Sequence, residues 1–176
     1  MLELVTDRQI YQEVICRRIP HAQKYLWIAT ADIKDLYVDK NSKKVPFLEI
    51  LSDLVAEHVE IRLLHAKEPG PAFRQDFDRY PNLIEGIERI LCPRIHLKTI
   101  VIDGTFAYTG SANLTGAGLG AKNENKRNFE NGIVTTDQKL IIDLMEQFDR
   151  IWSGNHCPPC QRKKYCADYQ DLIAEK

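Results

Sequence analysis

A short run of polar residues set among apolar ones, between Pro93 and Asn113, constrains the fold of this 176-residue chain more than any other feature. His96 and Lys98 are separated by Leu97. Side chains alternate between the two faces of a β-strand, so a strand here places the imidazole and the ammonium on one face and the leucine in the core. The stretch therefore predicts a strand that presents two polar groups side by side.

The residues after Lys98 predict a hairpin that returns to the same place. The apolar run through Ile102 continues the strand, Asp103-Gly104 is typical of a tight hairpin turn, and residues 106–109 return antiparallel. The return strand leads into Gly110-Ser111-Ala112-Asn113. We therefore expect a hydroxyl and an amide to lie beside the imidazole and the ammonium.

The spacing of these residues resembles the signature of the phospholipase D superfamily, HxKx4Dx6GSxN. Its six fixed positions are occupied here by His96, Lys98, Asp103, Gly110, Ser111 and Asn113, and six matches at fixed spacing make a specific pattern. The resemblance covers the chain from about Leu2 to Gly154. It implies an α/β fold, a phospholipase D-like α/β/α sandwich with a mixed, largely parallel sheet, in which residues 1–154 form the catalytic domain.

The resemblance implies phosphodiester hydrolysis, and the residue types suit that reaction. A neutral imidazole can attack phosphorus and form a phosphohistidine, which divides one difficult step into two, so His96 is the expected nucleophile. Lys98, Ser111 and Asn113 are expected to hold the non-bridging oxygens and to stabilise the transition state. This chemistry requires no metal, and the sequence has no convincing carboxylate cluster of the two-metal kind.

Two further requirements of the reaction point to a partner and to an acidic residue. The leaving group needs a general acid, and a second imidazole suits that task. Superfamily members pair two motifs, whereas this chain has one copy of the full motif, so the resemblance implies a homodimer in which the two His96 rings face each other. Family members also carry an acidic residue that bonds the histidine and fixes its tautomer, and Glu130 is the best match. Asp103 and Gly110 are expected to be structural, with Asp103 capping backbone amides of its own turn.

The first half of the chain supports an α/β arrangement. Thr6 and Gln9 form a capping-box pattern that predicts a helix ending near Pro20. The apolar runs 25–30 and 59–64 predict strands, and the helix expected from Pro46 lies between them, which indicates a crossover unit. The charged segment 40–44 predicts an exposed loop.

The second half contains the motif and a terminal helix. Residues 72–79 predict a short helix, whereas 81–90 is compatible with helix or coil. Residues 129–135 predict a strand that carries Glu130. Thr136 is expected to cap a last helix with an apolar face, which ends at Gly154.

Composition limits the location of the protein more than its activity. No stretch approaches roughly 20 consecutive apolar residues, and the first residues lack the pattern of a signal peptide, so we expect a cytoplasmic protein without a membrane span. Five cysteines in that compartment indicate thiols or metal ligands rather than disulfides. The net charge of −1 neither indicates nor excludes binding to nucleic acid, since a local basic groove decides that property.

A segment rich in Gly, Asn and Lys, residues 116–128, predicts a mobile loop beside the motif. Lys122, Lys126 and Arg127 in this loop are candidates for binding a polyanionic substrate. The alternative is a solvated charged loop without a ligand.

The tail, residues 155–176, is rich in cysteine and is a candidate for a small metal-binding element. Cys157, Cys160 and Cys166 have a spacing that can enclose zinc, and His156 can complete four ligands. His156 and Cys157 are adjacent, which strains simultaneous ligation, so Asp168, Cys92 or another residue is an alternative fourth ligand. The same thiolates can hold an iron–sulfur cluster, which is the less favoured alternative to structural zinc, and three unligated thiols in a flexible tail are the remaining one.

The sequence thus predicts a homodimeric, metal-independent phosphodiester hydrolase that acts on nucleic acid. We expect it to be an endonuclease. One alternative is a phospholipase D or phosphatidyltransferase that uses the same residues on phospholipid. Another is a nucleic-acid-binding module with a vestigial site that docks through the basic tail residues Arg162, Lys163 and Lys164. The pattern does not distinguish DNA from RNA or one strand from two.

Overall fold

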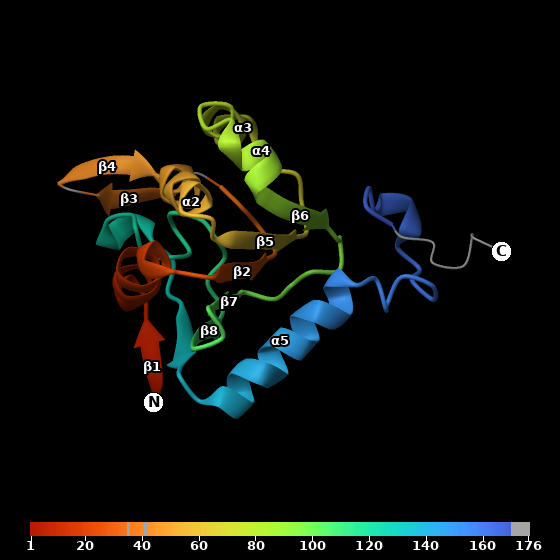
Figure 1. The fold of residues 1–176 in the computed structure, drawn as a ribbon. Helices are drawn as coiled ribbons and strands as arrows, with labels where there is room; N and C mark the ends of the chain where they lie inside the picture. Colours follow the sequence, from red (N-terminus) through yellow and green to blue (C-terminus); the bar gives the residue numbers. More distant parts are fainter. Residues whose placement is uncertain (35, 41, 170–176) are drawn as a thin grey trace.

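The computed structural model describes residues 1–34, 36–40 and 42–169, so Asn41 of the expected loop and residues 170–176 of the tail lie outside the described part. The chain forms one seven-stranded sheet in the order β1-β9-β8-β7-β2-β5-β6 (Figure 1). Its strands are β1 (Leu2–Thr6), β2 (Tyr25–Thr30), β5 (Glu60–His65), β6 (Ile87–Leu91), β7 (Thr99–Ile102), β8 (Phe106–Gly110) and β9 (Asn131–Thr135). A separate hairpin consists of β3 (Tyr37–Lys40) and β4 (Lys43–Pro46).

Helices pack on both faces of this sheet. They are α1 (Arg8–Ile10), which continues as the π-helix η1 (Tyr11–Arg18) and the 3-10 helix η2 (Ile19–His21), then α2 (Phe47–Ala56), α3 (Pro71–Phe77), α4 (Asn82–Gly86), η3 (Glu124–Lys126), α5 (Gln138–Trp152) and η4 (Lys163–Tyr165). α5 lies on one side of the sheet, and η1 and α2 lie on the other (Figure 1). This arrangement is the α/β/α sandwich that the sequence predicts.

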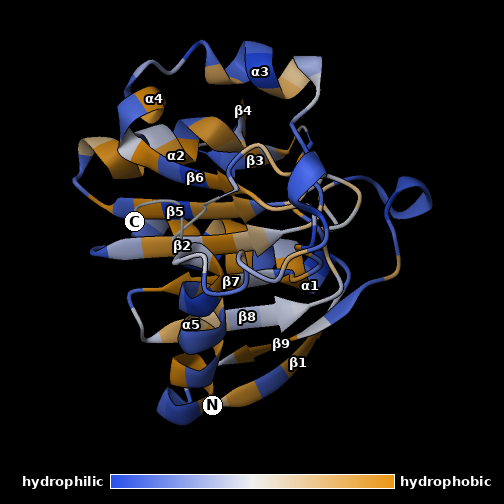
Figure 2. Ribbon diagram, turned by 90° about the vertical axis from the view of Figure 1, so that its right-hand side faces the viewer, coloured by the Kyte–Doolittle hydropathy of each residue, from blue (hydrophilic) through white to orange (hydrophobic). Residues whose placement is uncertain are grey.

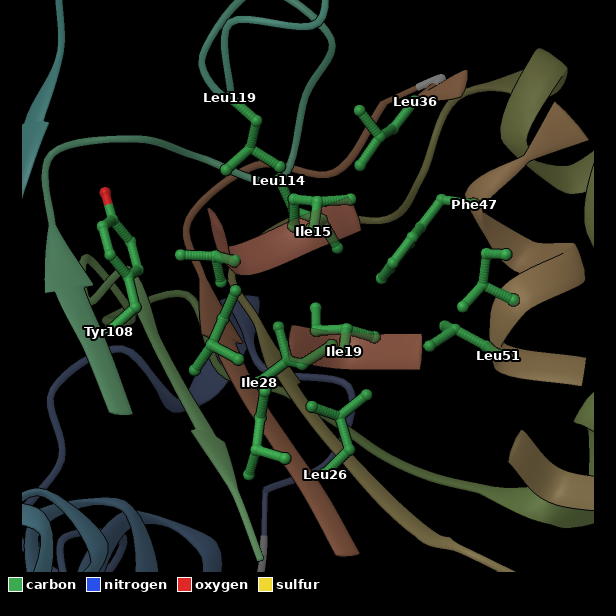
Figure 3. Close-up of a cluster of buried hydrophobic side chains, with 14 of the residues drawn as sticks. Ile15, Ile19, Leu26, Ile28, Leu36, Phe47, Leu51, Tyr108, Leu114 and Leu119 are labelled. Carbon is green, nitrogen blue, oxygen red and sulfur yellow. The ribbon is translucent and has the colours of Figure 1, made fainter. Parts of the chain in front are cut away.

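Strand alternation distributes the apolar residues between two cores. On the η1 and α2 face, buried residues such as Ile15 and Leu51 pack against Leu26 and Ile28 of β2 (Figure 3). On the α5 face, Phe148 packs with residues of alternate positions on the same strands. The central strands are rich in apolar residues, whereas α5 alternates apolar and polar positions (Figure 2). Such a pattern requires cover on both faces of the central strands.

The sheet is mixed, as expected, but its parallel part is confined to one edge. β2 is parallel to β5, and β5 to β6, through the crossover that the apolar runs indicate. The pairs β2–β7, β7–β8, β8–β9 and β9–β1 are antiparallel. The half of the sheet that carries the motif is therefore antiparallel rather than parallel.

Several elements differ from the expectations. β1 was not anticipated because Leu2 and Leu4 remain exposed at the edge of the sheet, so the segment has no continuous apolar run. Residues 40 and 42–44, expected in a loop, belong to the β3–β4 hairpin, and 81–90 divides into α4 and most of β6. The final helix is capped by Asp137, whose Oδ1 accepts from the backbone N–H of Leu140, and not by Thr136.

Candidate active site

His96 and Lys98 lie in the extended segment that leads into β7. The backbone N–H of Gly110 donates to the carbonyl of Lys98 at 3.1 Å, which extends the β7–β8 ladder past the end of the strand. The His96 side chain is exposed, Leu97 is half-buried, and Lys98 is buried at 8% relative exposure. Leu97 packs with the apolar cluster beneath α5, as the alternation predicts.

The Lys98 ammonium is held below the surface of the site. Its Nζ donates to the carbonyl oxygen of His96 at 2.7 Å. Burial lowers the pKa of Lys98, and the Glu130 carboxylate partly offsets that effect. A cation that is buried but close to a carboxylate is positioned to stabilise negative charge on a substrate, because solvent screens it weakly.

Ser111 and Glu130 form a hydrogen-bonded unit where β8 meets β9. The Ser111 hydroxyl donates to Glu130 Oε2 and accepts from the backbone N–H of Asn131 at 3.1 Å. The other Glu130 oxygen accepts from Asn128 Nδ2 at 3.1 Å. Both carboxylate oxygens are thus engaged, and among the described residues the His96 ring makes no hydrogen bond with Glu130. The expected Glu130–His96 bond is replaced by a bond to Ser111.

Asn113 has a polar atom without a protein partner. Its Oδ1 is buried, and within the described part of the chain nothing hydrogen-bonds to it. A buried polar atom left unpaired costs roughly 1–3 kcal/mol. Oδ1 only accepts hydrogen bonds, so a phosphoryl oxygen at this site would be bound by the Nδ2 donors of the same amide.

Asp103 has the structural role that the motif implies, but on different amides. It accepts hydrogen bonds from the backbone N–H groups of Gln23, Lys24 and Tyr25 at 2.8–3.2 Å. Two of these amides precede β2 and that of Tyr25 begins it, whereas the expectation placed them in the hairpin turn. Asp103 and Gly104 have φ of 53° and 64°, so the turn is of the primed kind that suits a hairpin.

Gly110 is required by close packing. A Cβ at this position would lie 2.5 Å from the carbonyl oxygen of Asn131 and 2.5 Å from Tyr108 Oη. The glycine thus lets β8 and β9 approach at the point where Ser111 meets Glu130. Tyr108 beneath it is buried, which raises its pKa to about 12, and sequence reasoning did not assign it to the site.

A basic groove of about 940 Å³ begins at Asn113. Four lysines line it: Lys34, Lys44, Lys122 and Lys126. Asp32 is the one acidic residue of this lining and pairs with Lys34 at 3.2 Å, so the lining is strongly positive although the whole chain carries −1. Arg127, the third cation expected here, does not line the groove and lies 3.8 Å from Glu124.

Two lysines of the groove were missed because their segments are distant in sequence. An isolated parallel bridge joins Ile33 to Leu114, and it places Lys34 beside the motif. Lys44 comes from the β3–β4 hairpin, which the sequence presented as a loop. Neither contact is indicated by any local pattern of residues.

The tail brings its cysteines to the end of β6 without closing a ligand shell. Cys157, Cys160 and Cys166 are free thiols and half-buried, as is Cys92. Over residues 1–34, 36–40 and 42–169, no group of three His, Cys, Asp or Glu side chains is close enough to hold a metal ion as it stands. The set of His156 with three tail cysteines therefore stays a prediction. The described helices include none that is both long and apolar enough to span a membrane.

Comparisons with known proteins agree with the motif and the fold. The family model described as "cardiolipin synthase, PLD-like domain" matches residues 15–152. A mitochondrial cardiolipin hydrolase from Chlamydomonas reinhardtii is 29% identical over 126 residues, which are 71% of this chain and 48% of that protein. The chain thus spans about half the length of this relative.

Solved structures share the fold at low sequence identity. Nuc from Salmonella typhimurium, a phospholipase D family member, aligns with a TM-score of 0.63 at 16% identity, over 87% of this chain and 95% of Nuc. NucT from Helicobacter pylori aligns with a TM-score of 0.63 at 13% identity, over 87% and 97%. Phosphatidylserine synthase from Haemophilus influenzae aligns with a TM-score of 0.55 at 14% identity, over 86% and 39%. With the intact motif and the family match over most of its length, the chain belongs to the phospholipase D superfamily of phosphodiesterases and related hydrolases.

Proposed function

We propose that this protein hydrolyses phosphodiester bonds of nucleic acid, as a homodimer and without a catalytic metal. The observation that carries the choice of substrate is the basic groove, which runs to Asn113. A polyanion bound along four lysines delivers one of its phosphates to the motif residues. Neutralising phosphates with lysines also releases counterions, which favours binding of a nucleic acid over a small ester.

In the proposed mechanism His96 attacks phosphorus and forms a phosphohistidine. The leaving alcohol takes a proton from the second imidazole, which is protonated at that stage. Water then attacks the phosphohistidine, and the second imidazole, now neutral, accepts the proton of that water. Lys98 and the Asn113 amide hold the non-bridging oxygens. Glu130 acts through Ser111, because its carboxylate accepts a hydrogen bond from the serine hydroxyl and orients it.

The second imidazole is proposed to come from His96 of a second copy. The ring is exposed in the single chain. The sequence has one other His-x-Lys, His65-Ala66-Lys67, but it lacks the rest of the motif and His65 is fully buried. A two-fold axis next to the motif places both rings over one phosphorus atom, and a two-fold interface is self-complementary.

A phospholipid substrate is the second candidate, and one structural observation favours it. A largely apolar cavity of about 400 Å³ lies between the sheet and α2–α4. Its lining includes Ile33 and Leu114, the two bridged residues next to Asn113. An acyl chain could occupy such a cavity while its phosphate meets the motif, as the lipid-related names of the family and of the algal relative suggest.

Parallel assays on single-stranded DNA, single-stranded RNA and cardiolipin vesicles test the proposal. With EDTA added at the assay, we expect the wild type to cleave nucleic acid and His96→Ala to lose detectable cleavage. The matched control is His21→Ala, an exposed histidine outside the motif. Hydrolysis of cardiolipin alone favours the second candidate. Equal cleavage of nucleic acid by wild type and His96→Ala contradicts the mechanism.

A further inference from the structure

Four of the five cysteines lie in two segments that contact each other at the end of β6. Cys92 follows β6 directly, and the other three belong to the tail after α5. The fifth, Cys16, lies in η1 on the opposite face of the sheet. A gathering of thiols from two segments far apart in sequence calls for a physical explanation.

Hydrogen bonds hold the tail against the residues that flank Cys92. Asp168 Oδ2 accepts from the backbone N–H of Leu91 at 2.7 Å, and Cys166 Sγ donates to the carbonyl of Leu91 at 3.4 Å. Arg162 Nη1 donates to the carbonyl of Pro93 at 3.1 Å. The tail therefore contacts the residues on both sides of Cys92, and it does so through defined hydrogen bonds.

The segment around Cys160 already has the local geometry of a thiolate ligand. The backbone N–H of Cys160 donates to the carbonyl of Cys157 at 3.0 Å, which closes a tight turn between the two cysteines. The backbone N–H of Arg162 donates to Cys160 Sγ at 3.4 Å. This amide and the Arg94 side chain place two hydrogen-bond donors beside Cys160 Sγ. Cys166 is half-buried against the end of β6.

We propose that Cys92, Cys157, Cys160 and Cys166 together bind one soft metal centre. Four thiolates form a common ligand set of a structural zinc ion and also of an iron–sulfur cluster. Cys92 replaces His156 as the fourth ligand, which removes the strain of ligation by two adjacent residues. Binding displaces the thiol protons and draws the sulfurs into a closed shell that the metal-free side chains do not form. Arg94 and Arg162 beside the thiols offset the negative charge of a tetrathiolate centre.

The position of Cys92 gives this centre a consequence for the active site. Cys92 lies four residues before His96 in the sequence, and the backbone N–H of Ile95 donates to its carbonyl at 3.0 Å. A metal ligand at Cys92 fixes the segment that carries the nucleophile. The tail is then a positioning element, because it touches neither the substrate nor the reacting atoms.

Metal content and thermal stability test this proposal on the full chain. We expect one zinc ion per chain in colourless protein, or iron and sulfide in coloured protein, measured by elemental analysis and visible absorption. Cys92→Ser should lower zinc affinity by about 100-fold or more, since even loss of an outer-shell partner costs about 10–100-fold. Cys16→Ser is the matched control and should keep the metal content of the wild type.

Three results would overturn it. The first is wild-type protein without zinc or iron that takes up neither zinc nor ferrous iron with sulfide. The second is a Cys92→Ser protein with the zinc affinity of the wild type. The third is a disulfide among the four cysteines in protein kept under reducing conditions. If Cys92→Ser fails to fold, Cys160→Ser replaces it, because Cys160 lies in the tail and outside the sheet; unchanged zinc affinity of that variant also contradicts the proposal.

Discussion

The motif hairpin and the cysteine tail both carry a short pattern of reactive side chains, but they fix those side chains in different ways. In the hairpin, residues 96–113 belong to or adjoin β7 and β8, and the ladder between the strands sets their positions. In the tail, residues 155–169 have only one short 3-10 helix, η4, and contacts to Leu91 and Pro93. A sequence motif that lies on strands therefore predicts where its side chains lie. A motif in an irregular segment predicts only which side chains are present.

The difference has an energetic side. Asp103 ties the hairpin to three backbone amides at the start of β2, and Gly110 lets β9 approach β8, so the motif residues of one chain are positioned by the fold itself. The tail thiols approach one another but stay open. In the proposed centre a bound metal orders the tail, whereas hydrogen bonds order the hairpin.

The largest effect is expected where the hairpin meets the substrate. Lys98→Met should reduce the rate of cleavage about 100-fold or more, because it removes a preorganised cation from the transition state. The measurement is the turnover of a labelled oligonucleotide at saturating substrate. Lys139→Met, at an exposed position of α5, should leave the rate unchanged. A loss below tenfold would show that Lys98 is not part of the machinery.

A loss of stability is expected when the anchor of the hairpin is removed. Asp103→Ala leaves three amides without their acceptor, and we expect the free energy of unfolding to fall by about 3 kcal/mol. Urea unfolding monitored by tryptophan fluorescence measures it. Asp143→Ala, exposed on α5, should change it by less than about 0.5 kcal/mol. Equal values for the two variants would mean that the hairpin is held by its strands alone.

A smaller effect is expected in the groove. Lys44→Gln should reduce the dependence of binding on salt, lowering the slope of log K against log salt by about 0.7 for a single-stranded nucleic acid. Binding is measured with the inactive His96→Ala protein so that the substrate stays intact. Lys24→Gln lies outside the groove and should leave the slope unchanged. An unaltered slope for Lys44→Gln as well would remove this hairpin from the binding surface.

The smallest effect concerns pH and tests a buried group next to the tail. His65 is fully buried, and burial lowers its pKa below the ordinary 6.5. The unfolded chain then binds the proton more readily, so the stability from this group is fully present above pH 6.5 and is lost as the pH falls below it. His65→Asn should flatten the fall in unfolding free energy between about pH 7 and pH 5, whereas His21→Asn should not. A slope unchanged by His65→Asn would assign the acid sensitivity to other groups.

The sequence predicted what local chemistry determines. β2, α2 and α5 were located by their apolar runs, because burial on one or two faces leaves a periodic trace in the residues themselves. The pairing of Lys98 with Gly110, the residue before Ser111, followed from strand alternation and the hairpin turn. In the single chain Glu130 contacts Ser111 rather than His96. Spacing could not predict that contact, because the 16 residues between Asn113 and Glu130 are mostly irregular.

Contacts between distant segments were beyond prediction for the same reason. Lys34 reaches the groove through the bridge from Ile33 to Leu114, 81 residues apart in sequence. The edge strand β1 left no trace because its leucines face outward. The family resemblance supplied roles for the motif residues but no information about either contact.

The bridge at Leu114 also affects how a substrate enters. The backbone N–H of Leu114 donates to Thr30 Oγ1 at 3.0 Å, so the residue after Asn113 is fastened to the end of a central strand. The floor of the groove is thereby ordered before any ligand arrives. The entropic cost of association then falls on the lysine side chains and on the incoming chain, while the amide that receives the phosphate stays in place.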